Sequence, residues 1–296
     1  MLKVKKAKFL FVTLIILRFF SIQFNIDLDD IRSLCGKLSV KNFRESIDKY
    51  LNDENIRKYY EAFKFNPDDD IDYYNRGTIY INFNQYEKAI QDFDKAIKLN
   101  PNLKEAYNNR GLAYSDLGQY EKAIQDYNKA LELNLNDYSV YKNRGLAYRR
   151  LNQYDLAIQD YNKAIEINPN YAEAYNNRAV TYVELGQYEK AIADYNIAIQ
   201  LNPNDADYYY NRGNSYMNGL KQYEQAIENY DKAIQINSDD YKYYLNRGVA
   251  YSRGLSQHEQ AVKDFEKAIE LNPNLSEVYN NLGISYNELK TMQNNK

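Results

Sequence analysis

The chain has 296 residues but only one cysteine, one histidine and five prolines, and it has no tryptophan. The single cysteine, Cys35, cannot form a disulfide within the chain and cannot build a metal site from several thiolates. The single histidine, His258, makes no catalytic triad without an orienting partner. We therefore expect no catalytic residues, no cofactor and no metal site, and we interpret His258 as a partly buried aromatic residue.

An excess of positive charge is also missing, because the formal net charge is −3 at pH 7. Proteins that bind nucleic acid or a membrane surface through charge usually carry a basic excess. The composition therefore argues against a nucleic-acid partner.

Tyrosine, by contrast, is abundant, with 33 residues, and it recurs at a nearly constant interval. Five tyrosines follow one another every 34 residues and two more follow at intervals of 35: Tyr73, Tyr107, Tyr141, Tyr175, Tyr209, Tyr244 and Tyr279. A period of this length predicts helix–turn–helix units that stack along the chain.

Each unit contains two helical patterns. In the second unit, the first pattern places four residues on one face of a helix, at i, i+3, i+4 and i+7: Tyr107, Arg110, Gly111 and Tyr114. A turn at residues 117–119 comes next. The second pattern again fills one face, with Ala123, Ile124, Tyr127, Ala130 and Leu131. In several units a proline then ends the second helix.

In the first unit the corresponding positions hold Tyr73, Gly77, Tyr80, Ala89, Phe93, Ala96 and Pro101. This pattern resembles the tetratricopeptide repeat family, and the resemblance covers roughly 220 residues. It implies an all-α fold, a right-handed α-solenoid of tandem helix–turn–helix repeats. It also implies a protein that binds a peptide or protein segment in the concave groove of the superhelix. Because no catalytic constellation is present in the sequence, we do not expect an enzyme.

Six full repeats are expected, at residues 70–103, 104–137, 138–171, 172–205, 206–240 and 241–275, followed by a capping helix at 276–290. The last two repeats have one extra residue each, which we place in the turns near Gly219 and Gly254. A stack of repeats needs a terminal cap with a polar outer side. We expect that side to carry Asn280, Asn281, Asn287 and Glu288.

The first 69 residues differ from the repeats. A lysine-rich start and an apolar run from Phe9 to Leu17 are typical of a signal peptide or an N-terminal membrane anchor, which we assign to residues 1–24. Residues 25–35 are expected to be a linker, and residues 36–69 a degenerate N-terminal repeat or cap. We expect an exported or membrane-anchored protein, with membrane association through residues 9–24, and a cytoplasmic protein is the alternative.

Asparagine recurs once per unit on the first helix, at Asn75, Asn109, Asn143, Asn177, Asn211, Asn246 and Asn281. A carboxamide both donates and accepts, so such a ladder can bind the backbone of an extended peptide. The alternative is a hydrogen bond between repeats. The candidate peptide-binding residues also include a basic spot made of Lys142, Arg149 and Arg150.

Arginine recurs at the next position, at Arg76, Arg110, Arg144, Arg178, Arg212 and Arg247. An arginine directed into a helix pair needs a charged partner. The second helices offer Asp92, Asp126, Asp160, Asp194 and Asp264, with Asn229 as the exception. We predict a structural Arg–Asp pair within each repeat, and the alternative is a basic ladder that binds phosphate.

The predicted function is that of a scaffold or adaptor that binds a peptide or protein ligand in the concave groove. Two alternatives stay open. One is a structural spacer or envelope-associated assembly protein that self-associates, and the other is the regulatory subunit of a separate enzyme.

Overall fold

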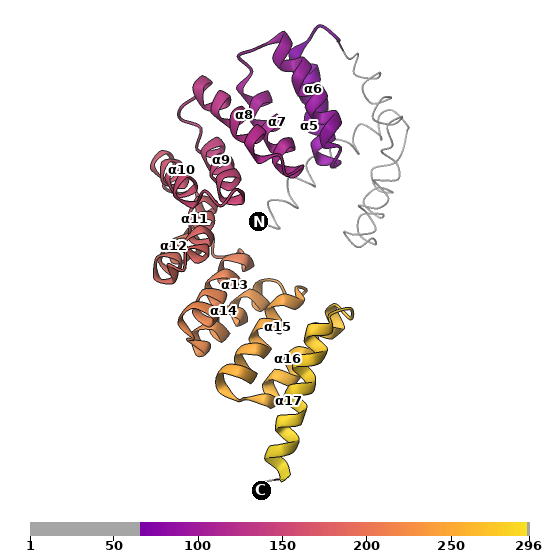
Figure 1. The fold of residues 1–296 in the computed structure, drawn as a ribbon, viewed down its shortest axis with the longest axis vertical. Coiled ribbons are helices and arrows are strands. Elements are labelled where there is room, and N and C mark those ends of the chain that lie inside the picture. The colour runs from indigo at the N-terminus through magenta and orange to yellow at the C-terminus, as the bar shows by residue number, and fades with distance from the viewer. Residues whose placement is uncertain (1–65, 295–296) are drawn as a thin grey trace, which may run out of the picture. The chain divides into compact units, whose positions relative to one another are not determined.

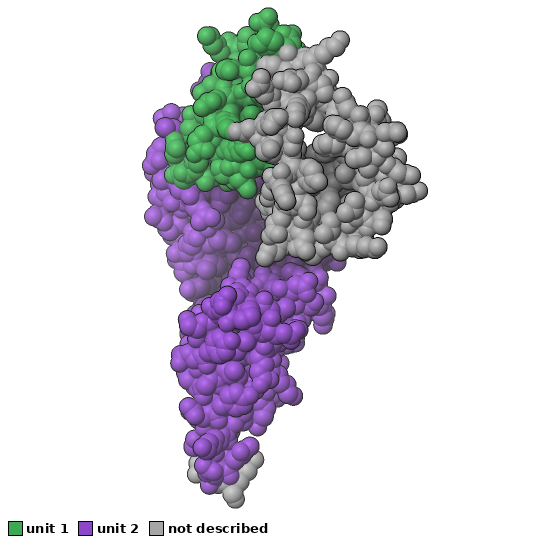
Figure 2. Space-filling model, turned by 90° about the vertical axis from the view of Figure 1, so that its right-hand side faces the viewer, with its two compact units in different colours: residues 1–119 green, residues 120–296 purple. Residues whose placement is uncertain are grey.

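The computed structural model describes residues 66–294. The chain divides into two compact units at residues 119 and 120, and Figure 2 shows the described part of the first unit in green and that of the second in purple. The predicted signal peptide or anchor, the linker and almost all of the predicted N-terminal repeat lie outside the described residues. Within the described part of the chain, no helix is long and apolar enough to cross a membrane.

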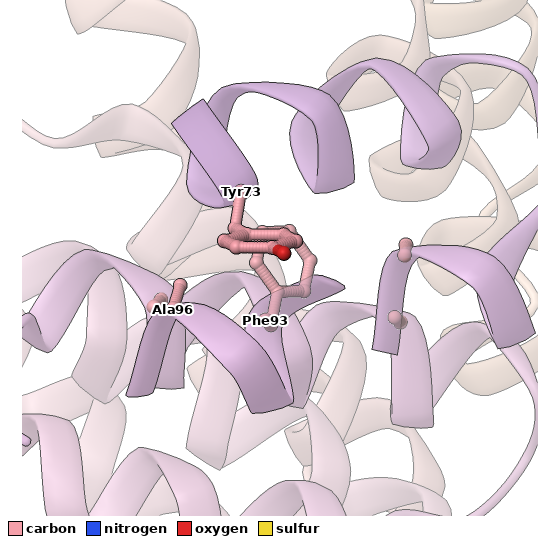
Figure 3. Close-up of a cluster of buried hydrophobic side chains, with 6 residues drawn as sticks. Tyr73, Phe93 and Ala96 are labelled. Atoms are coloured by element: carbon pink, nitrogen blue, oxygen red, sulfur yellow. The ribbon is translucent and has the colours of Figure 1, made fainter. Parts of the chain in front are cut away.

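The described part of the first unit contains α5 (Asp70–Asn82), α6 (Tyr86–Leu99) and α7 (Lys104–Asp116). Asp69 is the N-cap of α5, because its side chain accepts hydrogen bonds from the backbone N–H groups of Ile71 and Asp72. Tyr73 of α5 points toward Phe93 and Ala96 of α6 (Figure 3), and all three side chains are buried. The first repeat is therefore a helical hairpin that closes over an aromatic residue.

The second unit continues with helices of the same two kinds (Figure 1). Its elements are α8 (Tyr120–Leu133), α9 (Tyr138–Arg150), α10 (Tyr154–Ile167), α11 (Ala172–Glu184), α12 (Tyr188–Leu201), α13 (Ala206–Asn214), η1 (Ser215–Leu220), α14 (Tyr223–Ile236), α15 (Tyr241–Val249), η2 (Ala250–Gly254), α16 (His258–Leu271) and α17 (Ser276–Asn294). We call α5, α7, α9, α11, α13, α15 and α17 the first helices and the remaining α-helices the second helices. Within this unit, consecutive helices pack against each other.

Each second helix contains one aromatic side chain that is completely, or almost completely, buried. These residues are Phe93, Tyr127, Tyr161, Tyr195, Tyr230 and Phe265. In most repeats a glycine of the first helix makes room for the ring. A Cβ atom added to Gly145 would lie 2.8 Å from the Tyr161 ring, which is closer than real contacts allow. Small residues on one helix and a ring on the other thus set the distance between the two helices.

The turn inside each repeat contains one residue in the left-handed conformation. That residue is a glycine in two repeats, Gly118 and Gly186, and otherwise Asn84, Asn152, Lys221 or Ser256. The next residue is always a glutamine, and its backbone N–H donates to a tyrosine carbonyl near the end of the first helix, as Gln153 does to Tyr148 at 2.9 Å. This conformation disfavours residues with a Cβ atom, so the four non-glycine turns each carry a small strain.

The extra residue of the fifth and sixth repeats lies inside the first helix and not in the turn, so the predicted position was wrong. In both repeats the first helix ends in a π-helical segment, η1 or η2. The wider π turn absorbs one residue and leaves the start of the second helix unchanged. The N–H of Gln222 still donates to the carbonyl of Tyr216, at 3.0 Å, now six residues away.

The π turns also change how neighbouring repeats touch. A Cβ atom added to Gly219 would lie 2.3 Å from the ring of Tyr188, and one added to Gly254 would lie 2.2 Å from the ring of Tyr223. Tyr188 and Tyr223 each belong to the second helix of the preceding repeat. The inserted glycines therefore let a helix backbone approach the face of a tyrosine in the previous repeat.

Candidate ligand-binding surface

The recurrent arginines form the frame that holds the surface in place. Arg76 donates from Nε and Nη2 to both carboxylate oxygens of Asp92, at 2.6 and 2.7 Å. The same two-bond contact joins Arg144 to Asp160, Arg178 to Asp194 and Arg247 to Asp264. Paired parallel bonds of this kind fix orientation as well as distance. The predicted Arg–Asp pair is confirmed in these four repeats.

A third bond from most of these arginines reaches the preceding repeat, which the sequence prediction missed. Nη1 of Arg144 donates to Oδ1 of Asn128 at 2.6 Å, and Nη1 of Arg178 donates to Oδ1 of Asn162 at 2.5 Å. The equivalent acceptors of Arg110, Arg212 and Arg247 are Asp94, Asn196 and Asp231. The signal was present in the sequence, because an Asn or Asp follows the buried aromatic residue of the second helix in each of these repeats.

Arg212 differs from the others because both of its acceptors are amides. Its Nε donates to Asn229 at 2.7 Å and its Nη1 to Asn196 at 2.6 Å. Burial lowers the pKa of Arg212, whereas the hydrogen bonds and charges of Asp264 and Asp231 raise the pKa of Arg247 despite its burial. Because Arg144, Arg178, Arg212 and Arg247 already donate to acceptors in two second helices, a phosphate-binding ladder finds no support in this geometry.

The seven recurrent asparagines fall into three groups: four that link repeats, one that is buried, and two whose carboxamides have no recorded hydrogen bond. Four of them bond to a side chain on the preceding first helix or its π turn: Asn109, Asn211, Asn246 and Asn281. In the clearest case, Nδ2 of Asn246 donates to Oδ1 of Asn214 at 2.8 Å and to the hydroxyl of Tyr210 at 3.1 Å. At these four positions the asparagine is a link between repeats, which is one of the two interpretations of the ladder.

The other three asparagines behave differently. Asn143 is only 7% exposed, so its carboxamide lies within the packed structure. Asn75 is exposed and Asn177 is partly exposed. Within residues 66–294, the structure records no hydrogen bond for the carboxamide of either residue. The ladder predicted from the sequence therefore leaves two positions, one in each unit, at which the carboxamide makes no hydrogen bond to another described residue.

The basic spot is neutralised by the next first helix. Nζ of Lys142 lies 3.8 Å from Oε2 of Glu173, and Nη1 of Arg149 donates to Oε1 of Glu184 at 2.7 Å. Burial lowers the pKa of Lys142, and the charge of Glu173 opposes this effect. Arg150 is exposed. Lys142 and Arg149 thus belong to a surface of mixed charge, and of the three predicted residues only Arg150 has no ion pair recorded among the described residues.

These ion pairs define one continuous surface, which we call the α9–α11 polar surface: Lys142, Arg149, Glu173, Asn177 and Glu184. Along α11, Asn177 lies one turn after Glu173 and two turns before Glu184, so the three side chains share one side of the helix. Two tyrosines border the surface, because the Tyr171 hydroxyl donates to Glu173 at 3.1 Å and its ring meets that of Tyr138 edge-on at 4.9 Å. The surface is polar, aromatic and cross-linked between repeats.

Comparison with known proteins places this geometry in a family. The model of the TPR repeat matches residues 77–118, 145–186, 181–219, 220–253 and 255–290, and the model of the tetratricopeptide repeat matches residues 105–137. The chain belongs to the tetratricopeptide repeat family. The family in general provides scaffolds for protein–protein interaction, and such scaffolding is the general function of the chain. No curated protein matches this chain well enough to count as a relative.

Solved structures share the repeat fold. A tetratricopeptide repeat protein from Parabacteroides merdae is 24% identical, with a TM-score of 0.61 over 83% of this chain and 95% of its own. The Cut9–Hcn1 heterotetramer of the APC/C is 18% identical, with a TM-score of 0.65 over 78% of this chain and 46% of that chain. The MamA protein is 29% identical, with a TM-score of 0.51 over 57% of this chain and 92% of its own. These structures confirm the predicted right-handed α-solenoid.

His258 occupies a family position that is a tyrosine in the other repeats. It begins α16, is buried, and its Nδ1 lies 3.3 Å from Oγ of Ser252, which in turn lies 3.0 Å from Oγ of Ser285. His258 thus stands in for the aromatic residue, as predicted, but its side chain is buried and not partly buried, and the imidazole links α16 to η2.

Proposed function

We propose that the α9–α11 polar surface binds an extended polypeptide segment of a partner protein, with Asn177 as the residue that contacts the partner's backbone. The proposal rests on the exposure and hydrogen bonding of Asn177. Its carboxamide is partly exposed and without a hydrogen-bond partner among the described residues, while the charged residues around it are held by ion pairs between α9 and α11.

The ion pairs support this role by reducing the cost of binding. Immobilising a long flexible side chain costs about 0.5–1.5 kcal/mol on association. Lys142 and Arg149 are already held by Glu173 and Glu184, so a ligand meets a surface that is ordered before it arrives. A carboxamide next to this surface can accept from one backbone N–H of an extended peptide and donate to one carbonyl. The mixed charge favours a segment that itself carries both signs of charge.

A peptide selection tests the proposal. Peptides of random sequence are selected for binding to the full chain, and the affinity of the best ones is measured by calorimetry for three variants. We expect Asn177→Ala to weaken binding by about tenfold, which corresponds to roughly 1.4 kcal/mol for the lost hydrogen bonds. The thermal midpoint should stay unchanged, since the carboxamide makes no hydrogen bond within the described residues.

Two matched controls use the same position in other repeats. Asn75→Ala removes the other carboxamide without a hydrogen bond, in the first unit, and should leave peptide affinity unchanged. Asn246→Ala removes a link between repeats, so we expect it to lower the thermal midpoint and to leave the affinity close to that of the parent chain. Equal affinity of the selected peptides for the parent chain and Asn177→Ala would show that the surface does not bind in this way.

A further inference from the structure

Helix α17 has the residue pattern of a first helix. Tyr279, Gly283 and Tyr286 occupy the positions held in the sixth repeat by Tyr244, Gly248 and Tyr251. The three residues are spaced by four and three positions, so they lie along one side of the helix. We call this side the α17 open strip. A neighbouring side of α17 packs on the sixth repeat: Val278 lies in its core with residues of α16, Ser285 contacts Ser252 of η2, and both side chains are fully buried.

The same strip is covered in the complete repeats. The glycine of the first helix there faces the aromatic ring of the second helix. A Cβ atom added to Gly77, Gly145, Gly213 or Gly248 would lie 2.7 or 2.8 Å from the ring of Phe93, Tyr161, Tyr230 or Phe265. Each of these glycines leaves the space that one aromatic ring occupies, and we call this space the seat of the ring.

On α17 the seat is empty among the described residues. A Cβ atom added to Gly283 would meet nothing within 4 Å. Tyr279 is 50% exposed, whereas Tyr244 at the same position is 9% exposed. Tyr286 is 47% exposed, although its hydroxyl donates to Glu266 at 2.7 Å. Two half-exposed tyrosine rings beside an unfilled glycine form an apolar face of the kind that marks a site of association.

We propose that the α17 open strip binds an amphipathic α-helix of a partner protein that completes a seventh repeat. The complete repeats show what such a helix must carry. Its aromatic residue has one alanine four positions earlier and another three positions later, as Ala261, Phe265 and Ala268 of α16 do. The aromatic ring occupies the seat at Gly283, and the alanines let the two backbones approach.

One residue of α17 makes the partner helix different from the chain's own second helices. The arginine position is occupied by Leu282, which packs against the core of the sixth repeat. In the sixth repeat Arg247 holds Asp264, the residue directly before the aromatic Phe265. Leu282 has no donor for such a carboxylate, and an unpaired buried carboxylate is strongly unfavourable. The partner helix therefore carries an apolar residue directly before its aromatic residue.

The binding of two synthetic peptides to the full chain tests this. The first peptide has the sequence of residues His258–Leu271 with Asp264→Leu, and the second keeps the aspartate. We expect the leucine peptide to bind with micromolar affinity and the aspartate peptide to bind at least about tenfold more weakly. Filling the seat with Gly283→Leu should abolish binding of the leucine peptide. Glu277→Ala changes an exposed residue on another side of α17, at the position of the exposed Lys242 in the sixth repeat, and should leave its binding unchanged.

A second variant is expected to gain binding, so its result cannot be explained by a failure of the chain to fold. Leu282→Arg restores the arginine of the complete repeats, so we expect it to reverse the preference in favour of the aspartate peptide. Absence of that reversal, or equal binding of both peptides to the parent chain, overturns the proposal. A concentration-dependent dimer in sedimentation experiments that Gly283→Leu abolishes also overturns it, because a second copy of the chain would then be the occupant. The strip shares no residue with the α9–α11 polar surface, so the two proposals fail separately.

Discussion

The sixth repeat and helix α17 use the same sequence positions for different ends. In the sixth repeat, Tyr244 and Gly248 face a second helix, and the ring of Phe265 fills the space between them. In α17 Tyr279 is half exposed, and within residues 66–294 no neighbour lies within 4 Å of a Cβ atom added to Gly283. The pattern that makes a first helix therefore does not itself determine burial, because burial depends on whether a second helix is present. The same residues stabilise one repeat and leave a surface on the other.

The largest expected difference in stability comes from removing an aromatic ring in the sixth repeat and in α17. Phe265→Ala removes a fully buried side chain from the sixth repeat, and we expect it to lower the free energy of unfolding by about 3–5 kcal/mol. Tyr279→Ala removes a half-exposed ring from α17 and should change it by less than about 0.5 kcal/mol. Urea denaturation of both variants, with hydrogen exchange of the amides in α15 and α16 as a local measure, checks the contrast. A large loss in Tyr279→Ala would mean that α17 is covered in solution.

The next difference concerns the arginine position. Arg247→Leu places the residue of α17 into the sixth repeat and leaves the buried Asp264 without its partner, so we expect a loss of about 3 kcal/mol. The double variant Arg247→Leu with Asp264→Leu removes both charges and should recover most of that loss. Thermal and urea unfolding measure both. A double variant as unstable as the single one would show that the bond from Arg247 to Asp231 matters more than the pair with Asp264.

The smallest expected effect on stability comes from replacing the glycine by alanine. It has opposite signs in the sixth repeat and in α17. Gly248→Ala forces a Cβ atom to within 2.7 Å of the Phe265 ring, and overpacking of this kind costs about 1–3 kcal/mol. Gly283→Ala meets no neighbour, and alanine favours a helix over glycine by about 1 kcal/mol, so this variant should be more stable than the parent chain. The shift of the thermal midpoint of each variant gives the sign directly.

The sequence predicted most of the fold and only part of the surface. The spacing of the tyrosines and the positions of glycine, alanine and proline determine the hairpins, because these residues act within one repeat. The predicted Arg–Asp pair could be found for the same reason. The bond from Arg144 to Asn128 joins different repeats, and the pattern within one repeat did not predict it. The bond from Asn246 to Asn214 also joins repeats, and the sequence predicted it only as one of two interpretations of the asparagine ladder.

Two errors have the same physical origin. The sequence predicts the extra residue in the turn near Gly219, but the fifth repeat absorbs it in a π turn against Tyr188 of the fourth. Asn281 was assigned to the polar side of the capping helix, yet it is 4% exposed and accepts a hydrogen bond from Arg253 at 3.0 Å. In both cases the neighbouring repeat decides the position. The same holds for the predicted basic spot, because Lys142 and Arg149 are paired with Glu173 and Glu184 of the next repeat.

The amide partners of Arg212 have a consequence for how the stack comes apart. A repeat array unfolds as a row of coupled elements, and the weakest coupling decides where a folded segment ends. Arg247 ties the sixth repeat to the fifth with a carboxylate from each, whereas Arg212 ties the fifth repeat to the fourth with two neutral amides. Unfolding that begins at the C-terminal end thus meets a weaker link after Arg247 has been released. The fifth and sixth repeats are then expected to be lost together, as one cooperative segment.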